Sequence, residues 1–192
     1  MREKSFAENQ RTILDKVLEN WRANKVKKYI KRGDAVYDLG CGYEGAFLKK
    51  IREDLNEGTG LDISVSRDFY DKKIKLKEAD LNRRLPLQDC SADAVVSLAV
   101  IEHLDDYRGY LKETHRILRN GGTLLVTTPD PKSEFILKIL GKICLIDDKE
   151  INDHKRYFHP ETLMSELKKI GFYSIIHKKF QCGLNNLLIA KK

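Results

Sequence analysis

Acidic residues recur in this sequence at the ends of short apolar stretches, where a carboxylate can contact a ligand. Asp38, Asp62, Asp80 and Glu102 each take such a position. If the stretches are neighbouring parallel strands, these side chains meet at one edge of a sheet. Carboxylates accept hydrogen bonds from hydroxyls and amines and attract cations, and they repel phosphates. The pattern therefore favours a ligand with a cation, vicinal hydroxyls and an exocyclic amine, although Asp62 and Asp80 taken singly also fit as local caps.

A glycine-rich turn follows the first apolar stretch. Gly40, Gly42 and Gly45 come directly after a short buried strand, and apolar residues then recur at helical spacing from 46 to 51. Glycine permits a sharp turn and a close approach of a ligand to the backbone, and the following helix points free N–H groups at that ligand. Because Gly-x-Gly-x-x-Gly also satisfies the dinucleotide-binding fingerprint, the glycines alone leave an NAD-binding oxidoreductase open.

The elements that must position these residues alternate along the chain as strand and helix. Strands are predicted at 34–39, 58–63, 74–80, 92–100 and 123–128, and helices at 46–52, 64–71, 105–119 and 159–169. Two further strands at 173–180 and 184–190 form a hairpin. Right-handed crossovers make this an α/β, doubly wound sheet of five parallel strands plus a C-terminal antiparallel hairpin, with helices on both faces. We expect residues 1–192 to form one domain.

The leading segment is basic and helical in pattern. Apolar residues recur at near-helical intervals over 5–31, and residues 1–32 contribute +6 of the net charge of +7. Such a segment suits nucleic acid, an anionic substrate, a membrane surface or simply a solvated helix face.

The sequence shows no signal for membrane insertion or secretion. No run of 18 apolar residues is present, so we expect no transmembrane helix. The N-terminus lacks the apolar region of a signal peptide, so we expect none. The cysteines at 41, 90, 144 and 182 form no Cys-x-x-Cys pair, so we expect no metal site and a reducing, cytoplasmic location.

Taken together, the motifs resemble those of class I S-adenosylmethionine-dependent methyltransferases of the type 11, small-molecule group. The similarity covers roughly residues 30–129, from Val-Tyr-Asp-Leu-Gly-Cys-Gly at 36–42, through Gly-Leu-Asp-Ile at 60–63 and Glu-Ala-Asp-Leu at 78–81, to Asp-Ala-Val-Val-Ser-Leu-Ala-Val-Ile-Glu-His-Leu at 93–104 and Leu-Arg-Asn-Gly-Gly at 118–122. The resemblance implies a Rossmann-like fold, S-adenosylmethionine as cofactor and S-adenosylhomocysteine as product.

The resemblance also implies which residues contact the cofactor. The turn at 38–42 would approach its methionyl part, Asp62 its ribose hydroxyls, and Asp80 its adenine amine. The full set is Asp38, Gly40, Cys41, Gly42, Asp62, Ile63, Asp80, Leu81 and Ala99. This sequence departs from the family in one respect: Tyr43 and Glu44 separate the second and third glycines, where one residue is usual.

Catalytic and acceptor-binding residues are predicted after the fourth strand and before the last helix. His103 is the candidate base for a hydroxyl or amine acceptor, with Glu102 beside it to orient it; packing against the next helix is the alternative. The resemblance implies acceptor contacts for His154, Arg156 and Tyr157, within an acceptor-side segment at 130–158, and an N-cap role for His159. Basic and aromatic side chains there suit an anionic or phenolic small molecule.

Three functions remain open at this stage. The first is a small-molecule methyltransferase acting on an oxygen, nitrogen or carbon nucleophile. The second is an RNA methyltransferase, favoured by the basic leading segment but lacking the Asn/Asp-Pro-Pro-aromatic motif of amino-group base methylators after the fourth strand. The third is an NAD-binding oxidoreductase or a non-catalytic cofactor-binding module, and Asp38 ahead of the glycines counts against the dehydrogenase.

Overall fold

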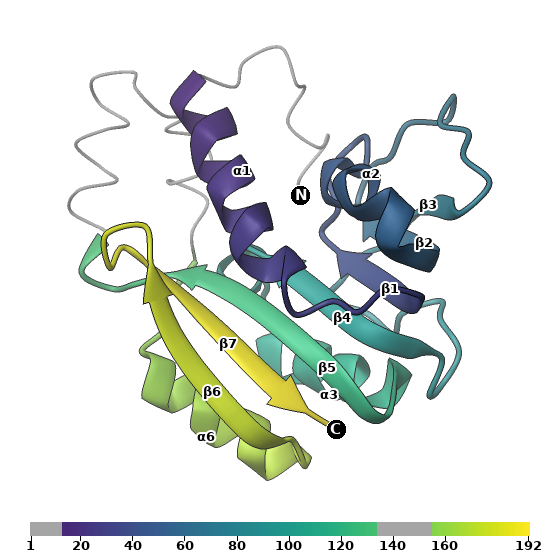
Figure 1. The fold of residues 1–192 in the computed structure, drawn as a ribbon. Helices are drawn as coiled ribbons and strands as arrows, with labels where there is room; N and C mark the ends of the chain where they lie inside the picture. The colour runs from purple at the N-terminus through teal and green to yellow at the C-terminus, as the bar shows by residue number, and fades with distance from the viewer. Residues whose placement is uncertain (1–12, 134–154) are drawn as a thin grey trace.

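A seven-stranded sheet forms the centre of the protein (Figure 1). The computed structural model describes residues 13–133 and 155–192. The strands are β1 (Asp34–Leu39), β2 (Leu55–Asp62), β3 (Ile74–Glu78), β4 (Ala92–Leu98), β5 (Leu118–Pro129), β6 (Tyr173–Phe180) and β7 (Asn185–Lys191). Their order across the sheet is β3-β2-β1-β4-β5-β7-β6. The first five strands are parallel to one another, and β7 runs antiparallel to both β5 and β6, as predicted.

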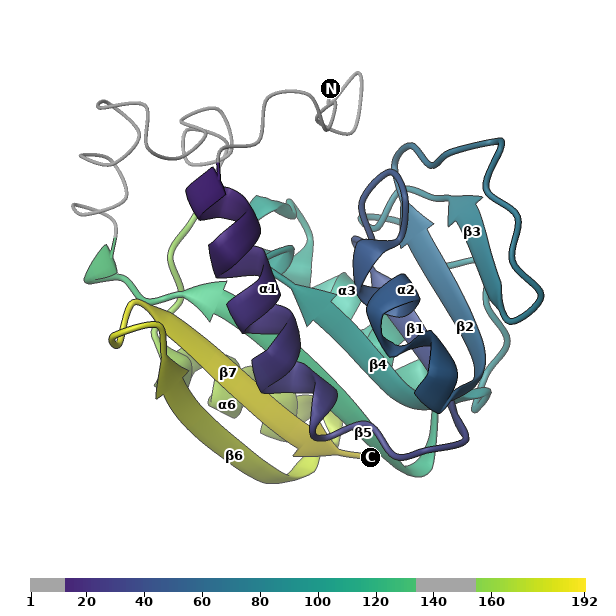
Figure 2. The same cartoon turned by 45° about the horizontal axis from the view of Figure 1, so that its top comes forward.

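Helices cover both faces of this sheet (Figures 1 and 2). On one face lie α1 (Ile13–Lys27) and α2 (Ala46–Ile51), and on the other α3 (Tyr107–Ile117) and α6 (Pro160–Ile170). Two short 3₁₀ turns, η2 (Arg52–Asp54) and η3 (Ile101–His103), follow α2 and β4. Each face has its own apolar core, which is the arrangement expected of a doubly wound sheet.

The central strands contribute side chains to both apolar cores. In β4, Val95 packs on the side of α3 and α6, and Val96 packs on the side of α1 and α2. Tyr37 and Val36 of β1 divide in the same way. This two-sided burial explains the nearly continuous apolar run at 92–100 and confirms the strand predicted there. By contrast, β3 alternates apolar and charged residues because it lies at the edge of the sheet.

The predicted helix at 64–71 is wrong, and with it the strict alternation of strand and helix. Residues 63–73 connect β2 to β3 as a loop. Asp71 accepts hydrogen bonds from the backbone N–H groups of Lys73 and Ile74, and its side chain pairs with Arg52. Such local bonds between a carboxylate and the backbone compete with helix formation. Tyr70, which is 85% exposed, contributes nothing to an apolar helix face.

The ends of the two longer helices on the far face follow the sequence signals. Asp106 caps α3 by accepting a hydrogen bond from Gly109 N–H at 2.9 Å. Pro160 begins α6, and Gly171 ends it in the left-handed conformation at φ 115°. His159 occupies the N-cap position of α6, as predicted. Its side chain makes no hydrogen bond to the first turn, so it does not cap the helix through its imidazole.

Candidate functional site

The glycine turn brings the backbone of β1 against the end of β2. Gly40 and Gly42 have φ values of 86° and 73°, which disfavour residues with a side chain. The N–H groups of Gly40 and Cys41 both donate to Leu61 O, at 2.7 and 3.1 Å. A Cβ at Gly40 would lie 2.2 Å from Cγ2 of Val100, so the turn also packs closely on the segment after β4.

Asp62 holds this turn through its carboxylate. One oxygen accepts from Gly42 N–H at 2.8 Å and the other from Ile63 N–H at 2.7 Å. Asp62 is half-buried, and Ile63 beside it is 42% exposed. A carboxylate held by two backbone donors keeps further lone pairs for a ligand. The sequence thus placed Asp62 correctly at the end of β2 and beside the turn.

Asp38 is a buried carboxyl group with a raised pKa. Its residue is only 1% exposed, and its Oδ1 has no hydrogen-bond partner. Burial, and secondarily the nearby charge of Asp62, raises the pKa of Asp38 to about 8. A buried acid with an unused oxygen can stabilise a cation that binds beside it. That property matches the cationic ligand expected from the sequence.

Cys41 completes the turn as a packing residue. Its thiol is buried, and burial raises its pKa, as do the charges of Asp38 and Asp62. A Cβ on Gly60 would lie 2.7 Å from the Cys41 sulfur, so the two strands approach closely here. A thiol in this environment stays protonated and is a poor nucleophile.

Asp80 and Leu81 lie beyond the end of β3. Asp80 is half-buried and accepts from Asn82 N–H at 3.0 Å, and Arg83 Nε lies 3.2 Å from its carboxylate. The backbone hydrogen bond from Asn82 is the largest influence that lowers the pKa of Asp80, so this carboxyl is ionised at neutral pH. Leu81 is buried in the core under α3 and α6. Asp80 therefore also serves as a turn cap, one of the two roles that the sequence left open.

The end of β4 contains a residue whose strain the sequence did not indicate. Ala99 has a φ of 56°, and its N–H donates to both the carbonyl oxygen and Oγ1 of Thr127, at 3.0 and 3.1 Å. A non-glycine residue in this conformation is uncommon and is held by its surroundings. Thr127 is thus a supporting residue that the sequence analysis missed. Its only signal was its position at the carboxyl end of the fifth strand.

His103 lies in η3, next to the segment that precedes α6. His103 is half-buried, whereas Glu102 is fully buried. The backbone N–H of Lys155 donates to Glu102 O at 3.0 Å, so residues 155–158 run beside η3. Two of the predicted acceptor residues, Arg156 and Tyr157, follow Lys155 in this segment, and both are half-buried. His154 lies outside the described residues, as does most of the segment at 130–158.

Arg156 is packed on an aromatic ring in this structure. Its guanidinium lies 5.1 Å from the ring centre of Tyr107, and its Nη2 donates to Asp105 O at 3.4 Å. Phe158 packs edge-on against the same ring at 5.0 Å. These contacts fix the segment to the start of α3.

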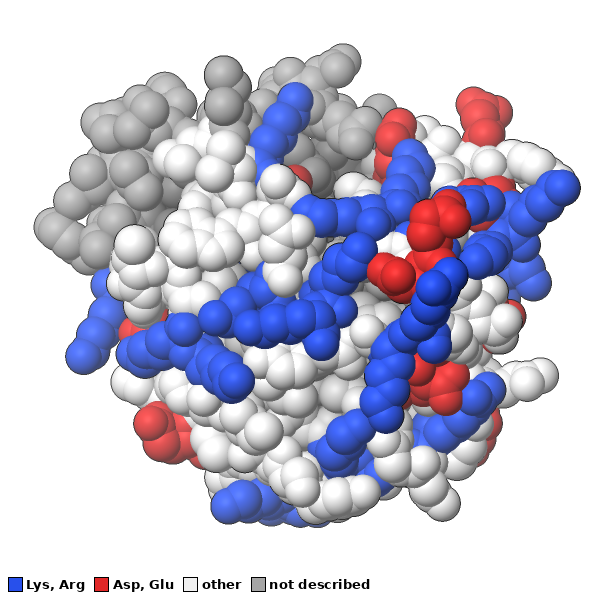
Figure 3. Space-filling model, viewed as in Figure 1, with Lys and Arg blue, Asp and Glu red and all other residues white. Residues whose placement is uncertain are grey.

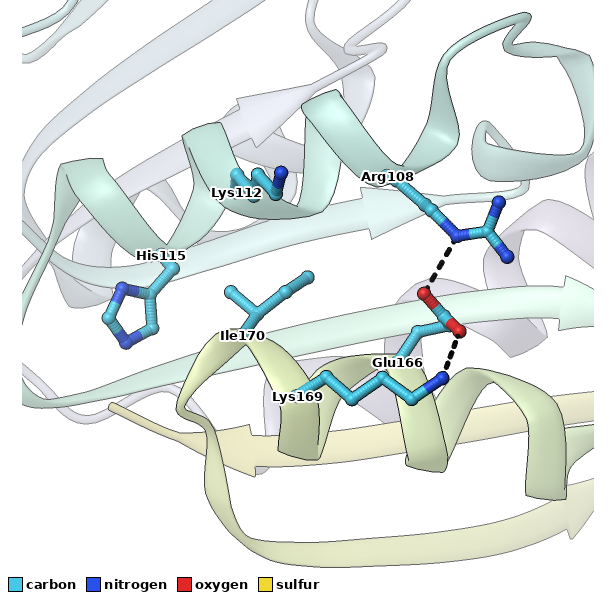
Figure 4. Close-up of a pocket in the computed structure, with 6 residues that line it drawn as sticks. All are labelled: Arg108, Lys112, His115, Glu166, Lys169 and Ile170. Atoms are coloured by element: carbon cyan, nitrogen blue, oxygen red, sulfur yellow. Dashed lines mark hydrogen bonds and ion pairs between the residues drawn. The ribbon is translucent and has the colours of Figure 1, made fainter.

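A separate surface cavity lies between α3 and α6 (Figure 4). It has a volume of about 480 Å³, and its lining residues are Arg108, Lys112, His115, Glu166, Lys169 and Ile170. Glu166 bridges Arg108 and Lys169 at 2.8 and 2.9 Å. None of the predicted site residues lines this cavity, so it is distinct from the acidic edge of the sheet.

The described residues contain no cluster of three or more His, Cys, Asp or Glu side chains that could hold a metal ion. Among the same residues, no helix is long and apolar enough to span a membrane.

Comparison with known proteins identifies the family. Residues 37–126 match the family described as "Methyltransferase domain". A probable S-adenosylmethionine-dependent methyltransferase of Mycobacterium tuberculosis is 35% identical over 189 residues, covering 91% of this chain and 62% of the relative. The demethylmenaquinone methyltransferase of Listeria welshimeri is 30% identical over 199 residues, covering 90% and 84% of the two chains.

A solved structure has the same fold. A methyltransferase from Archaeoglobus fulgidus aligns with a TM-score of 0.70 at 22% identity, covering 94% of this chain and all of the other. The chain belongs to the S-adenosylmethionine-dependent methyltransferases, and S-adenosylmethionine is the cofactor of this family. It spans 39% to 62% of the length of its mycobacterial relatives.

Proposed function

We propose that this protein transfers the methyl group of S-adenosylmethionine to a small-molecule acceptor with an oxygen, nitrogen or carbon nucleophile. The observation that carries the proposal is the alignment of Asp38, Asp62 and Asp80 around a glycine turn at the carboxyl ends of β1, β2 and β3. This edge is where open α/β sheets bind ligands.

The residues at this edge fit the chemical groups of the cofactor. The positive φ values of Gly40 and Gly42 let a ligand approach the turn without meeting a Cβ. The carboxyl group of Asp38, whose pKa is raised to about 8 in the free protein, would be stabilised in its ionised form by an ammonium or sulfonium group bound beside it. Asp62 and Asp80 offer carboxylate oxygens for ribose hydroxyls and the adenine amine, with Ile63, Leu81 and Ala99 as apolar neighbours. Bound S-adenosylmethionine supplies a methyl group on a positively charged sulfur, a leaving group that needs no further activation.

The protein then has to align the acceptor and exclude water. His103 is the side chain we assign to remove a proton from a hydroxyl or amine acceptor. Arg156 and Tyr157, in the segment that Lys155 anchors to Glu102, would contact an anionic or phenolic acceptor. A relative named for demethylmenaquinone, a small molecule, supports this acceptor class over RNA.

Calorimetric titration tests the cofactor site directly. Wild-type protein is titrated with S-adenosylmethionine, S-adenosylhomocysteine and NAD, alongside Asp62→Ala and the control Glu57→Gln, an exposed residue at the far end of β2. We expect both sulfur ligands to bind and NAD not to bind. Asp62→Ala should weaken binding by about tenfold to a hundredfold, the loss expected for a charged hydrogen-bonding partner, whereas Glu57→Gln should not.

A radiolabelled methyl-transfer assay then separates the acceptor classes. Phenolic, carboxylated and amine acceptors are compared with transfer RNA, using His103→Ala and His103→Gln to test the proton acceptor. Methylation of RNA with no methylation of small molecules would refute the acceptor class. Binding of NAD alone would refute the cofactor assignment.

A further inference from the structure

The outward side of α1 is apolar over half its length, which is unusual for a surface helix. Leu14, Val17, Trp21 and Asn24 fall on one side of the helix because a helix repeats every 3.6 residues. Val17 is 53% exposed and Trp21 46% exposed, so the sheet does not cover them. The opposite side carries Ala23 and Val26, which are buried in the core.

Cations border this apolar surface. Lys25 lies next to this side in the last turn of α1, Lys28 follows directly after the helix, and Lys178 belongs to β6. The ammonium groups of Lys28 and Lys178 lie 5.4 and 5.6 Å from the ring centre of Tyr29, two residues after the end of α1. Figure 3 shows the result: an uncharged area over the middle of α1 with a band of Lys and Arg along its lower border.

Acidic residues of α1 are kept off this side. Asp15 and Glu19 fall on the flank and the inner side of the helix, and both are half-buried. We call the surface formed by Val17, Trp21 and Asn24, with the half-buried Lys25 and with Lys28 just after α1, the α1 surface. It combines an aromatic and an aliphatic side chain with positive charge and, within the described part of α1, no carboxylate.

We propose that the α1 surface is a docking site for an anionic lipid bilayer, with Val17 and Trp21 entering the interface and the lysines contacting the headgroups. Tryptophan favours the boundary between headgroups and acyl chains, and lysines extend their charges toward anionic headgroups while their methylene stems stay apolar. A patch of exposed apolar residues rimmed by cations is the chemistry that such a surface recognises.

Two other occupants fit this surface less well. A second copy of the chain would bring two cationic surfaces together in a protein whose net charge is already +7. Single-stranded nucleic acid stacks its bases on several aromatic faces, but this surface offers Trp21 alone. The Tyr29 ring is already flanked by Lys28 and Lys178, and Val17 offers nothing to a base or a phosphate. Only the bilayer uses both the apolar residues and the lysines.

The proposal does not depend on methyl transfer, because it concerns a surface and is tested by binding. Figure 2 shows the N-terminal end of α1 at the end of the sheet to which the parallel strands point. A bilayer bound to α1 would therefore lie beside the edge that carries the acidic residues.

Trp21 is the only tryptophan in the sequence, so its fluorescence reports on this surface alone. The full chain is mixed with vesicles of phosphatidylcholine or of equal parts phosphatidylcholine and phosphatidylglycerol. We expect co-sedimentation and a blue shift of Trp21 emission with the anionic vesicles only, both weakened by high salt.

Paired variants separate the contributions of the two parts of the surface. Lys25→Gln/Lys28→Gln should weaken binding roughly thirtyfold, the loss expected for two lysines near an anionic surface. The control Lys75→Gln/Lys77→Gln removes the same charge from exposed positions on β3 and should change binding little. Val17→Ser should reduce both co-sedimentation and the blue shift. Circular dichroism checks that each variant is folded.

Three results would overturn the proposal. The first is an absence of binding to anionic vesicles, and the second is equal loss of binding in the α1 and β3 variants. The third is a protein that does not respond to vesicles but binds something else through this surface. Binding of nucleic acid would appear as quenching of Trp21 by single-stranded oligonucleotides, and self-association as a dimer in sedimentation velocity that Val17→Ser abolishes. The last pair of outcomes would assign the surface to nucleic acid or to a second copy of the chain.

Discussion

Asp38 and Glu166 are both largely removed from solvent, yet burial has opposite consequences for them. Asp38, at the acidic edge, is 1% exposed and has one oxygen without a partner, and its pKa is raised to about 8. Glu166, in the cavity between α3 and α6, is 9% exposed and is bridged by Arg108 and Lys169. The Arg108 hydrogen bond, followed by that from Lys169, lowers the pKa of Glu166 to about 2.

The difference shows that partners, and not burial alone, decide what a carboxylate does. Glu166 has its cations within the protein, so its charge ties α6 to α3. Asp38 lacks such a partner, so its charge is available to a cationic ligand at the cost of stability in the free protein. A cationic ligand would therefore stabilise the charge of Asp38 at the acidic edge. The charge of Glu166, in the cavity between the helices, needs no ligand because cations of the protein already pair with it.

The largest expected effect comes from replacing the unpartnered acid. Because the pKa of Asp38 is higher in the folded state than the ordinary value of 3.8, the folded protein binds the extra proton between pH 4 and 8. Its contribution thus makes stability fall as the pH rises through that range, by an amount on the order of 5 kcal/mol. Asp38→Asn should remove this slope, as measured by urea unfolding at several pH values.

Asp38→Asn also tests whether the charge of Asp38 contributes to cofactor binding. Asp38→Asn should weaken S-adenosylmethionine binding above pH 8, where the wild-type carboxylate is charged, more than below it. An unchanged pH profile of both stability and affinity would contradict the role assigned to Asp38.

Gly40→Ala should have the next largest effect. It forces an alanine to a φ of 86° and places its Cβ 2.2 Å from Val100 Cγ2, which together should destabilise the protein by about 2–4 kcal/mol. Gly33→Ala is the matched control, since Gly33 has a φ of 91° with no atom within 4 Å of the added Cβ. That control should cost only about 1 kcal/mol and leave cofactor affinity intact. Equal losses in denaturant unfolding would show that backbone strain, rather than the close approach to Val100, governs the turn.

The cap of α3 links the two regions, because this helix begins after η3 and lines the cavity with its outer side. Asp106→Ala removes the hydrogen bond from Gly109 N–H and should destabilise the protein by about 1 kcal/mol. Asp106→Ser, which preserves an acceptor, should recover most of that loss in thermal unfolding. A failure of serine to rescue would indicate a role other than capping.

Glu166→Gln should give the smallest effect, because Arg108 and Lys169 are themselves largely exposed. The folded-state pKa of Glu166 is below the ordinary value of 4.5, so its stabilising contribution is fully present above about pH 4.5 and is lost as the pH falls toward 2. The difference in unfolding free energy between wild type and Glu166→Gln should therefore disappear in acid, opposite to the trend for Asp38. A difference that persists at pH 2 would contradict the ion-pair explanation.

Local patterns predicted most of the architecture. The strands predicted at 92–100 and 74–80, the helix predicted at 159–169 and the final hairpin are all present, because hydrophobic period and turn chemistry act within a few residues. The helix at 64–71 was predicted wrongly. Competing bonds from Asp71 to the backbone are equally local, but they do not follow from apolar periodicity.

For the candidate site, too, some properties follow from the sequence and others only from the tertiary structure. The sequence alone determined which acidic residues and glycines stand at the ends of the strands, since that depends on residue order and on the parallel topology. Only the tertiary structure decided that Asp38 is buried without a partner for one oxygen, that Val100 closes over Gly40, and that Thr127 holds Ala99 in a strained conformation. Those properties arise where strands distant in the sequence pack together, and they set desolvation and strain that no single stretch of chain encodes.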